Sequence, residues 1–405
     1  MGNGRLSMTQ ASELREFRSD TRAWLAGNCP EGVRGPGPIP WGSRRQALDR
    51  DALLWLERMA ERGWTVPSWP KRYGGDELTK EQYRVLIEEL GRIGARPPLT
   101  GRGVNYIGPT LLEYGTDAQK ERWLPGIARG EGGWAMGYSE PGAGSDLASL
   151  ATRAVRDGDR LVLNGPKVWT SDAMEADYIF VLVRTSPDKP KHLGISLVLV
   201  DMHQPGVVVR PIRLISGASP FNETLFEDAE ANADDIVGGV DNGWTVGKRL
   251  LQFERSTHAG INTSGSQGGR DDDNRLAERM VAQVGLDGGG RMNHAGLRRR
   301  LIDCRVNDQA QRLTRQRVIE ETSARAPGFA SSAVKLTGAV NTQMSQELLL
   351  DAMGLNGIGW SDEAFADDDL EATRDWLRQK ALTIAGGTLE VQLNIVSKRV
   401  LGLPD

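Results

Sequence analysis

The densest group of residues able to bind a ligand is a glycine-rich polar segment, YSEPGAGSD, at residues 138–146. Glycines let the backbone approach a ligand closely, and serine hydroxyls with free backbone N–H groups bind phosphates or the edge of a heteroaromatic ring. A plain glycine-rich hinge is the alternative, and composition alone favours it. The spacing matches neither GxGxxG nor GxxxxGK[ST], so it supports neither of the common nucleotide folds.

A second segment, NGPKVWTS at residues 164–171, places two hydroxyls directly after an indole. Trp169 offers a flat surface for stacking, and Thr170 and Ser171 offer hydrogen bonds. Most tryptophans in strands belong to the core, so this segment alone indicates packing. Together with residues 138–146, it predicts a site for a planar cofactor.

Composition excludes several other kinds of chemistry. The 405 residues include 50 Lys and Arg against 54 Asp and Glu, a net charge of −4, so nucleic-acid binding is not expected. Two cysteines and four scattered histidines predict neither a disulfide framework nor a metal site. There is no membrane-spanning apolar run and no apolar centre of a secretion signal near the start of the sequence, so we expect a cytoplasmic protein.

The elements that position these segments follow from hydrophobic periodicity. Apolar residues at three- and four-residue spacing predict helices over 9–26, 50–63, 81–95 and 109–130. Runs rich in β-branched residues predict strands over 160–164, 178–184, 194–201 and 207–213. Helical spacing returns over 244–255, 312–325, 331–353 and 369–385. The expected architecture is therefore α+β and multidomain, with helices, then strands, then helices.

Two local expectations can be compared with a structure. Thr116 is the predicted N-cap of a helix that ends at Pro125 and Gly126. Residues 263–292 hold two glycine-rich stretches around a short helical piece, which predicts a mobile surface loop. A loop that becomes ordered at a subunit interface or on a ligand is the alternative.

Several segments, in order, closely resemble the acyl-CoA dehydrogenase family. They are YSEPGAGSDLASL, NGPKVWTS, FNETLFEDAEA followed by DNGWTVGKRLL, and TIAGGTLEVQLNIVSKRVLGLP. GWTVPSWPKRYGG and GPTLLEYGTDAQKERWLPGI match the helical domain at the N-terminal end of that family. The resemblance runs from about residue 50 to 403 and is weakest over 263–330. It implies an N-terminal all-helical domain (1–134), a central β-barrel or sandwich domain (135–241) and a C-terminal four-helix bundle (242–405).

The resemblance also implies FAD as the cofactor and assigns residues to it. By motif, Tyr138 and Ser139 would lie along the flavin, and Trp169 and Ser171 would contact the isoalloxazine and its N5 region. Ser145 would lie near the pantetheine or phosphates of coenzyme A. The implied reaction removes an α-proton from an acyl thioester while negative charge on the carbonyl oxygen is stabilised. The β-hydrogen passes to the flavin, and the product is a trans-2-enoyl thioester.

The base of this reaction is not where many family members carry it. Those members have Glu in a Tyr-Glu-Gly-Thr segment, but residues 385–388 read AGGT, and Gly386 cannot take a proton. Isovaleryl- and long-chain-type members instead carry Glu directly before Arg on a bundle helix, which corresponds here to Glu254 and Arg255. The resemblance therefore makes Glu254 the candidate base, where the sequence alone suggests an exposed helix glutamate. Gly386 would offer its N–H to the thioester oxygen, Thr388 would contact the cofactor, and Arg255 would support the active site or coenzyme A.

Partners and rival functions follow from the same resemblance. An acyl-CoA is the implied substrate, an electron-transfer flavoprotein the implied acceptor, and a homo- or hetero-oligomer (dimer or tetramer) the implied assembly. The Arg-x-x-Phe-Gly segment of many homotetrameric members has no match over 263–292. A flavin-poor structural subunit of a mixed complex is therefore one alternative, and an oxidase using oxygen is another. With only Gly386 and Gly387 near the acyl β-carbon, we expect room for branched or bulky acyl groups.

Overall fold

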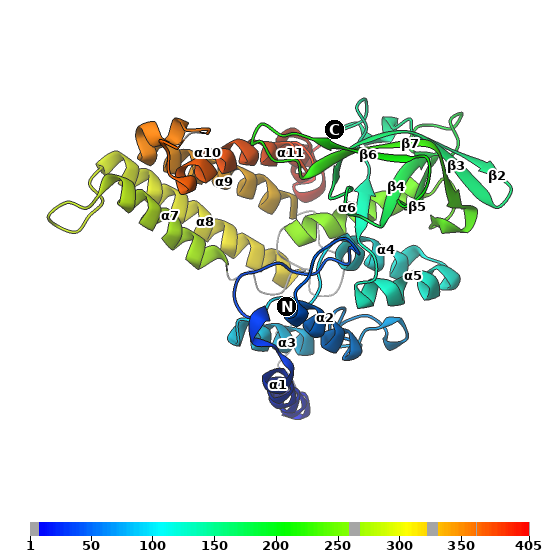
Figure 1. The fold of residues 1–405 in the computed structure, drawn as a ribbon, viewed down its shortest axis with the longest axis horizontal. Coiled ribbons are helices and arrows are strands. Elements are labelled where there is room, and N and C mark those ends of the chain that lie inside the picture. Colours follow the sequence, from blue (N-terminus) through cyan, green and yellow to red (C-terminus); the bar gives the residue numbers. More distant parts are fainter. Residues whose placement is uncertain (1–7, 259–267, 322–330, 362, 405) are drawn as a thin grey trace. The chain divides into compact units, whose positions relative to one another are not determined.

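The N-terminal part of the chain is helical. In this computed structural model, the described residues are 8–258, 268–321, 331–361 and 363–404. The helices of this part, shown in Figure 1, are α1 (Met8–Asn28), α2 (Arg50–Glu61), α3 (Lys80–Arg92), α4 (Gly108–Tyr114) and α5 (Asp117–Arg129). Asp49 caps α2 by accepting the N–H of Ala52, and Thr79 begins α3 with a capping box.

Helix α5 corrects one expectation from the sequence. Thr116 is its N-cap, as predicted, but the helix continues through Pro125 and ends at Gly130. Proline removes one hydrogen bond from a helix interior. The apolar stripe nevertheless continues beyond it, because Leu124 and Ile127 are both buried. Their burial offsets the lost bond, and Gly130, at φ +70°, supplies the left-handed residue that ends the helix.

The central part is an eight-stranded sheet. Its strands are β1 (Trp134–Gly137), β2 (Arg153–Asp157), β3 (Arg160–Ser171), β4 (Tyr178–Arg184), β5 (Ile195–Asp201), β6 (Val207–Ile212), β7 (Phe221–Asn232) and β8 (Ile236–Val237). Their order is β6-β7-β3-β2-β4-β5-β8, and β1 pairs with β4. Most pairs are antiparallel, whereas β4 runs parallel to both β1 and β2.

Strand β4, inside the sheet, is buried on both of its faces. Alternate side chains of a strand point to opposite faces. Phe180 and Leu182 belong to an apolar cluster that also includes residues of α4 and α5, such as Leu111 and Leu124. Val181 and Val183 belong to a second cluster that includes Phe226 of β7. A strand buried on both faces is continuously apolar, which explains the run YIFVLVR.

The C-terminal part is again helical. It comprises α6 (Gly243–His258), α7 (Gly268–Val284), α8 (Ala295–Glu321), α9 (Ser331–Met353), α10 (Asp367–Gln379) and α11 (Leu389–Ile395). Helix α9 packs against α7, α8, α10 and α11. Leu297 of α8 and Leu348 of α9 lie in the apolar cluster that these helices share. None of the described helices is long and apolar enough to cross a bilayer.

The predicted loop over 263–292 is wrong for most of its length. Residues 268–284 form α7, whose C-terminal half carries Leu276 and the fully buried Met280 into the bundle core. The glycine-rich composition concealed this apolar spacing. Residues 263–267 of that segment lie outside the described residues.

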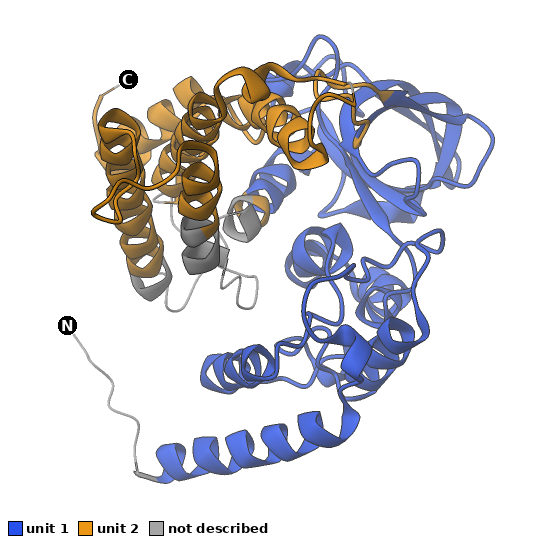
Figure 2. Cartoon of the chain, turned by 60° about the vertical axis from the view of Figure 1, so that its left-hand side comes forward, with its two compact units in different colours: residues 1–211, 221–251 blue, residues 212–220, 252–405 orange. Residues whose placement is uncertain are grey.

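The chain divides into two compact units, coloured separately in Figure 2. Unit 1 is Met1–Pro211 with Phe221–Leu251, and unit 2 is Ile212–Pro220 with Gln252–Asp405. The predicted order of helices, sheet and helices is confirmed. The three domain boundaries stay predictions.

Candidate functional site

In unit 1, the structure joins the two segments that the sequence singled out. The N–H of Val168 donates to the carbonyl oxygen of Ser139 at 2.9 Å. The ammonium of Lys167 donates to the carbonyl oxygen of Tyr138 at 3.1 Å. The backbone of Tyr138 and Ser139 is therefore fixed beside the residues that immediately precede Trp169.

A buried ion pair holds this junction. Lys167 Nζ lies 2.6 Å from Oε1 of Glu140, and both side chains are buried. Burial lowers the pKa of Lys167 to about 8, against the opposing charge of Glu140. Burial alone would raise the pKa of Glu140, but the charge and hydrogen bond of Lys167 and the N–H of Ala151 outweigh it, and this pKa is lowered. Both groups are thus charged at neutral pH.

Trp169 combines two unfavourable features. Its backbone lies in the left-handed region at φ +60°, and 56% of its surface is exposed. The register of β3 against β7 shifts between Lys167 and Thr170, so Trp169 sits in a bulge. Left-handed backbone is costly for a bulky residue, and such strain collects at functional sites. An indole held out in this way fits a stacked planar ring.

The other predicted residues of unit 1 differ in accessibility. Ser171 and Ser139 are half-buried and Ser145 is exposed. Gly142 and Gly144 have open space where a Cβ would stand, so the loop accepts a close neighbour. The ring of Tyr138 is buried and packs edge-on against Phe180. Tyr138 can therefore contact a ligand only through its backbone. Its carbonyl oxygen already accepts the hydrogen bond from Lys167.

In unit 2, the structure brings Glu254 and the AGGT segment near one lysine. Glu254, predicted on sequence alone to be exposed, is only 9% exposed. Lys335 of α9 interacts electrostatically with Glu254, and its ammonium donates to the carbonyl oxygen of Gly387 at 2.5 Å. The side chain of Arg255 lies outside the described residues.

The segment after α10 forms a turn with both glycines in the left-handed region. Gly386 has φ +66° and Gly387 has φ +96°. The amide of Gln392 donates to the carbonyl oxygen of Gly386 at 3.0 Å. Within the described residues, the N–H groups of Gly386 and Gly387 donate to no acceptor. Thr388 caps α11 by accepting the N–H of Val391.

Four residues of these clusters were missed by sequence reasoning: Glu140, Lys167, Lys335 and Gln392. Each lies inside or close to a recognised motif or a predicted helix. No local pattern marks Lys167 for burial, because lysine is rarely buried without a charged partner and its partner Glu140 lies 27 positions away. No local pattern marks Lys335, because its partners lie 81 and 52 positions away in the sequence.

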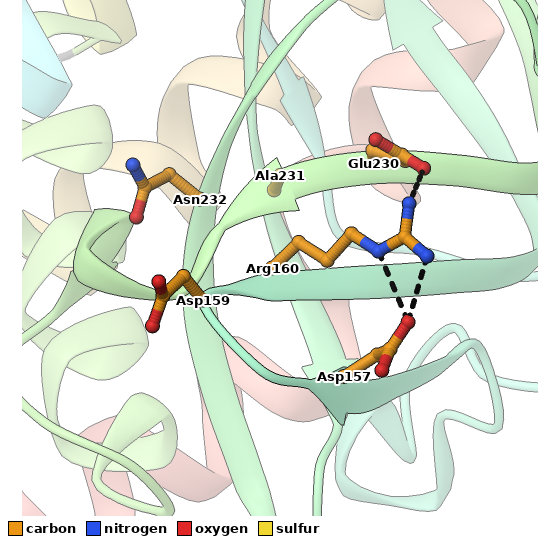
Figure 3. A pocket seen from close by; sticks show the side chains of 6 residues that line it. All are labelled: Asp157, Asp159, Arg160, Glu230, Ala231 and Asn232. Carbon is orange, nitrogen blue, oxygen red and sulfur yellow. Dashed lines mark hydrogen bonds and ion pairs between the residues drawn. The ribbon is translucent and has the colours of Figure 1, made fainter.

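A charged hollow on unit 1, shown in Figure 3, is lined by Asp157, Asp159, Arg160, Glu230, Ala231 and Asn232. The guanidinium of Arg160 pairs with the carboxylates of Asp157 and Glu230, 2.7 and 2.6 Å away. The hollow thus lacks a free cation for an anionic ligand and a flat surface for a ring. Lying at the turn between β2 and β3, it includes none of the predicted site residues.

Comparison with known proteins decides the family. Three family models match in order: the N-terminal domain of acyl-CoA dehydrogenases over residues 12–131, the middle domain over 135–229 and the C-terminal domain over 241–401. The chain belongs to the acyl-CoA dehydrogenase family. It is an oxidoreductase of a family that depends on FAD in general.

Relatives of this acyl-CoA dehydrogenase cover nearly its whole length. Acyl-CoA dehydrogenase IpdE1 of Mycobacterium tuberculosis is 37% identical over 97% of this chain and 98% of its own. The structure named Tcur3481-Tcur3483 steroid ACAD is 32% identical, with a TM-score of 0.72 over 97% of this chain and 98% of its own. The ChsE4-ChsE5 complex of Mycobacterium tuberculosis is 28% identical, with a TM-score of 0.71 over the full length of both chains.

Proposed function

We propose that this acyl-CoA dehydrogenase oxidises the α,β-bond of an acyl-CoA thioester, with Glu254 as the base and FAD as the cofactor. One observation carries the proposal. A carboxylate buried in unit 2 interacts with a lysine whose ammonium also holds the Gly386–Gly387 turn. A base and a free backbone donor are the two groups that α-proton removal requires.

Residues of unit 2 have separate roles in the removal of the α-proton. The Glu254 carboxylate takes the α-proton, and the electron pair of the broken C–H bond moves onto the thioester oxygen. The N–H of Gly386 donates to that oxygen where negative charge develops, and no described acceptor competes for it. Arg255, adjacent in sequence, would support the coenzyme A moiety.

The strained, exposed indole of Trp169 supports a flavin site in unit 1. Trp169 and Ser171 would contact the ring, with the backbone of Tyr138 and Ser139 along it. By the family motif, Thr388 would also contact the cofactor. Ser145, exposed beside two open glycines, would meet the pantetheine or phosphates. When bound, FAD supplies the two-electron acceptor for the β-hydrogen.

The substrate class we propose is a bulky, steroid-derived acyl-CoA. Gly386 and Gly387 place no side chain where many relatives carry a glutamate, and the nearest atom to a Cβ built on Gly386 is 3.9 Å away. The names of two similar structures include the word steroid. In a panel of acyl-CoAs, we expect kcat/KM to be highest for branched or polycyclic acyl groups. A preference for short straight chains contradicts this assignment.

For the electron acceptor we propose an electron-transfer flavoprotein. The acyl-CoA-reduced protein should pass electrons to it much faster than to oxygen. Rapid reoxidation by air, measured by stopped flow with product bound, supports the oxidase alternative.

A flavin-poor partner subunit is the second candidate function. Two similar structures carry paired names, one of them a complex, which favours a hetero-oligomer. The visible absorbance of the purified chain after mixing with FAD distinguishes a flavin-dependent dehydrogenase from a flavin-poor subunit. Our proposal predicts a yellow protein whose colour bleaches anaerobically on adding a good acyl-CoA, with an enoyl product two hydrogens lighter. A colourless protein favours the structural subunit.

A further inference from the structure

Lys335 on α9 interacts with both the proposed base and the turn that carries the proposed donor for the thioester oxygen. Its ammonium donates to the carbonyl oxygen of Gly387 at 2.5 Å and interacts electrostatically with Glu254. We propose that Lys335 is the positioning residue of this reaction, fixing the Gly386–Gly387 turn and balancing the negative charge on both sides of the proton transfer. This inference rests on the proposed function.

The turn requires external support because of its sequence. Two consecutive glycines have wide conformational freedom, and both occupy left-handed backbone here. Two side chains restrict them: the amide of Gln392 holds the carbonyl of Gly386, and the ammonium of Lys335 holds that of Gly387. A hydrogen bond from a charged donor is about twice as strong as a neutral one. Holding both carbonyls fixes the two peptide planes that follow Gly386 and Gly387, and this restricts the turn that presents the N–H of Gly386.

Burial explains why the lysine belongs with a carboxylate. Lys335 is half-buried, and burial lowers its pKa, whereas the charge of Glu254 raises it. A partly buried ammonium needs polar partners, and the partners of Lys335 are the two groups that the proposed reaction uses.

Charge balance gives Lys335 its role in the reaction. Before proton transfer, the negative charge resides on the carboxylate of Glu254. The α-proton then moves to that carboxylate, the C–H electron pair moves to the thioester oxygen, and the negative charge resides beside Gly386. The ammonium of Lys335 interacts with Glu254 and donates to the carbonyl oxygen of the residue after Gly386, so its positive charge would stabilise the negative charge before and after the transfer. Lys335 keeps its own protons throughout.

The test measures proton removal without oxidation. The substrate is an acyl-CoA whose β-carbon is replaced by sulfur, so that the α-proton exchanges with D2O while no β-hydrogen can leave. We expect Lys335→Met to slow α-exchange about tenfold or more with unchanged Kd for the thioester. Lys335→Arg, which keeps the charge and a donor, should restore part of the rate. Lys380→Met, which removes a bundle ammonium paired with Glu347, should stay within about twofold of the wild-type rate.

A second measurement is independent of turnover. Amide hydrogen exchange of the peptide covering residues 383–392 should become faster in Lys335→Met and stay unchanged in Lys380→Met. Native protection of this peptide together with a native rate of α-exchange in Lys335→Met overturns the positioning role while Glu254 chemistry stands. A wild-type protein that exchanges no α-proton from any thioester overturns the proposed function itself, whatever the protection shows.

Discussion

The ammonium of Lys167 on β3 donates a 2.6 Å hydrogen bond to Glu140, and neither side chain reaches solvent appreciably. This pair joins the glycine-rich loop to the strand that carries Trp169. Two segments 27 positions apart thereby become one rigid support for the exposed indole.

Removing one member of this pair should destabilise unit 1. Lys167→Met leaves the buried carboxylate of Glu140 without its cation, which costs about 3 kcal/mol of unfolding free energy. Arg160→Gln, which breaks exposed ion pairs in the same sheet, should cost less than about 1 kcal/mol. Urea denaturation measures both. Equal effects of the two substitutions contradict the buried pair as a structural support.

The same lysine predicts a pH dependence of stability. Its pKa in the folded protein is about 8, below the ordinary value of 10.5. The unfolded chain therefore binds the proton more tightly, and the contribution of Lys167 to the unfolding free energy rises as pH increases from about 8 to 10.5. Below pH 8 this contribution is constant. The difference between wild type and Lys167→Met, followed by denaturation across that window, should show the rise. A flat difference contradicts it.

Replacing Trp169 should weaken FAD binding without lowering the stability of the cofactor-free protein. Asparagine tolerates the left-handed backbone better than tryptophan, so Trp169→Asn should leave the unfolding free energy of the cofactor-free protein unchanged or raise it by up to about 1 kcal/mol. FAD affinity should fall about tenfold because a stacking surface is lost. Trp134→Phe, at a fully buried tryptophan of the same unit, should instead lower stability. Unchanged FAD affinity in Trp169→Asn contradicts the flavin site.

A methyl group at Gly386 should fit the available space but should strain the backbone. Space is available for a Cβ, yet φ +66° strains any L-residue. We expect Gly386→Ala to lower stability by about 1 kcal/mol and kcat by about tenfold, because the N–H of this residue is displaced. Steady-state kinetics with a good acyl-CoA checks the second effect. A native kcat in Gly386→Ala contradicts the expected dependence of the reaction on the position of this N–H.

The sequence was sufficient for the fold where signals are local. Periodicity and capping predicted the order of helices, sheet and helices, and Thr116 does begin α5. The prediction from sequence failed where burial in the tertiary structure determines the end of an element. Pro125 lies inside a helix because Leu124 and Ile127 are buried on either side of it. Helix α7 was predicted as a loop because glycine and aspartate obscured the apolar spacing that leads to Met280.

For the site, the motifs predicted the individual residues but not their connections. Trp169 was identified from its own segment and then from the resemblance, Glu254 from the resemblance alone, and their roles stay predictions. The left-handed backbone of Trp169 and the burial of Glu254 depend on strand register and helix packing, which no single segment encodes. Lys335 was predicted neither from its own segment nor from the resemblance, because its partners Glu254 and Gly387 lie in two other, distant parts of the sequence.

Anaerobic stopped-flow reduction of the FAD-loaded Glu254→Gln variant by a good acyl-CoA tests the central claim most directly. Loss of the base should slow flavin bleaching by about 100- to 10,000-fold while FAD content and thioester affinity stay native. Glu347→Gln, a carboxylate of the same unit paired with Lys380, should bleach at the wild-type rate. Bleaching of Glu254→Gln within about threefold of wild type contradicts Glu254 as the base.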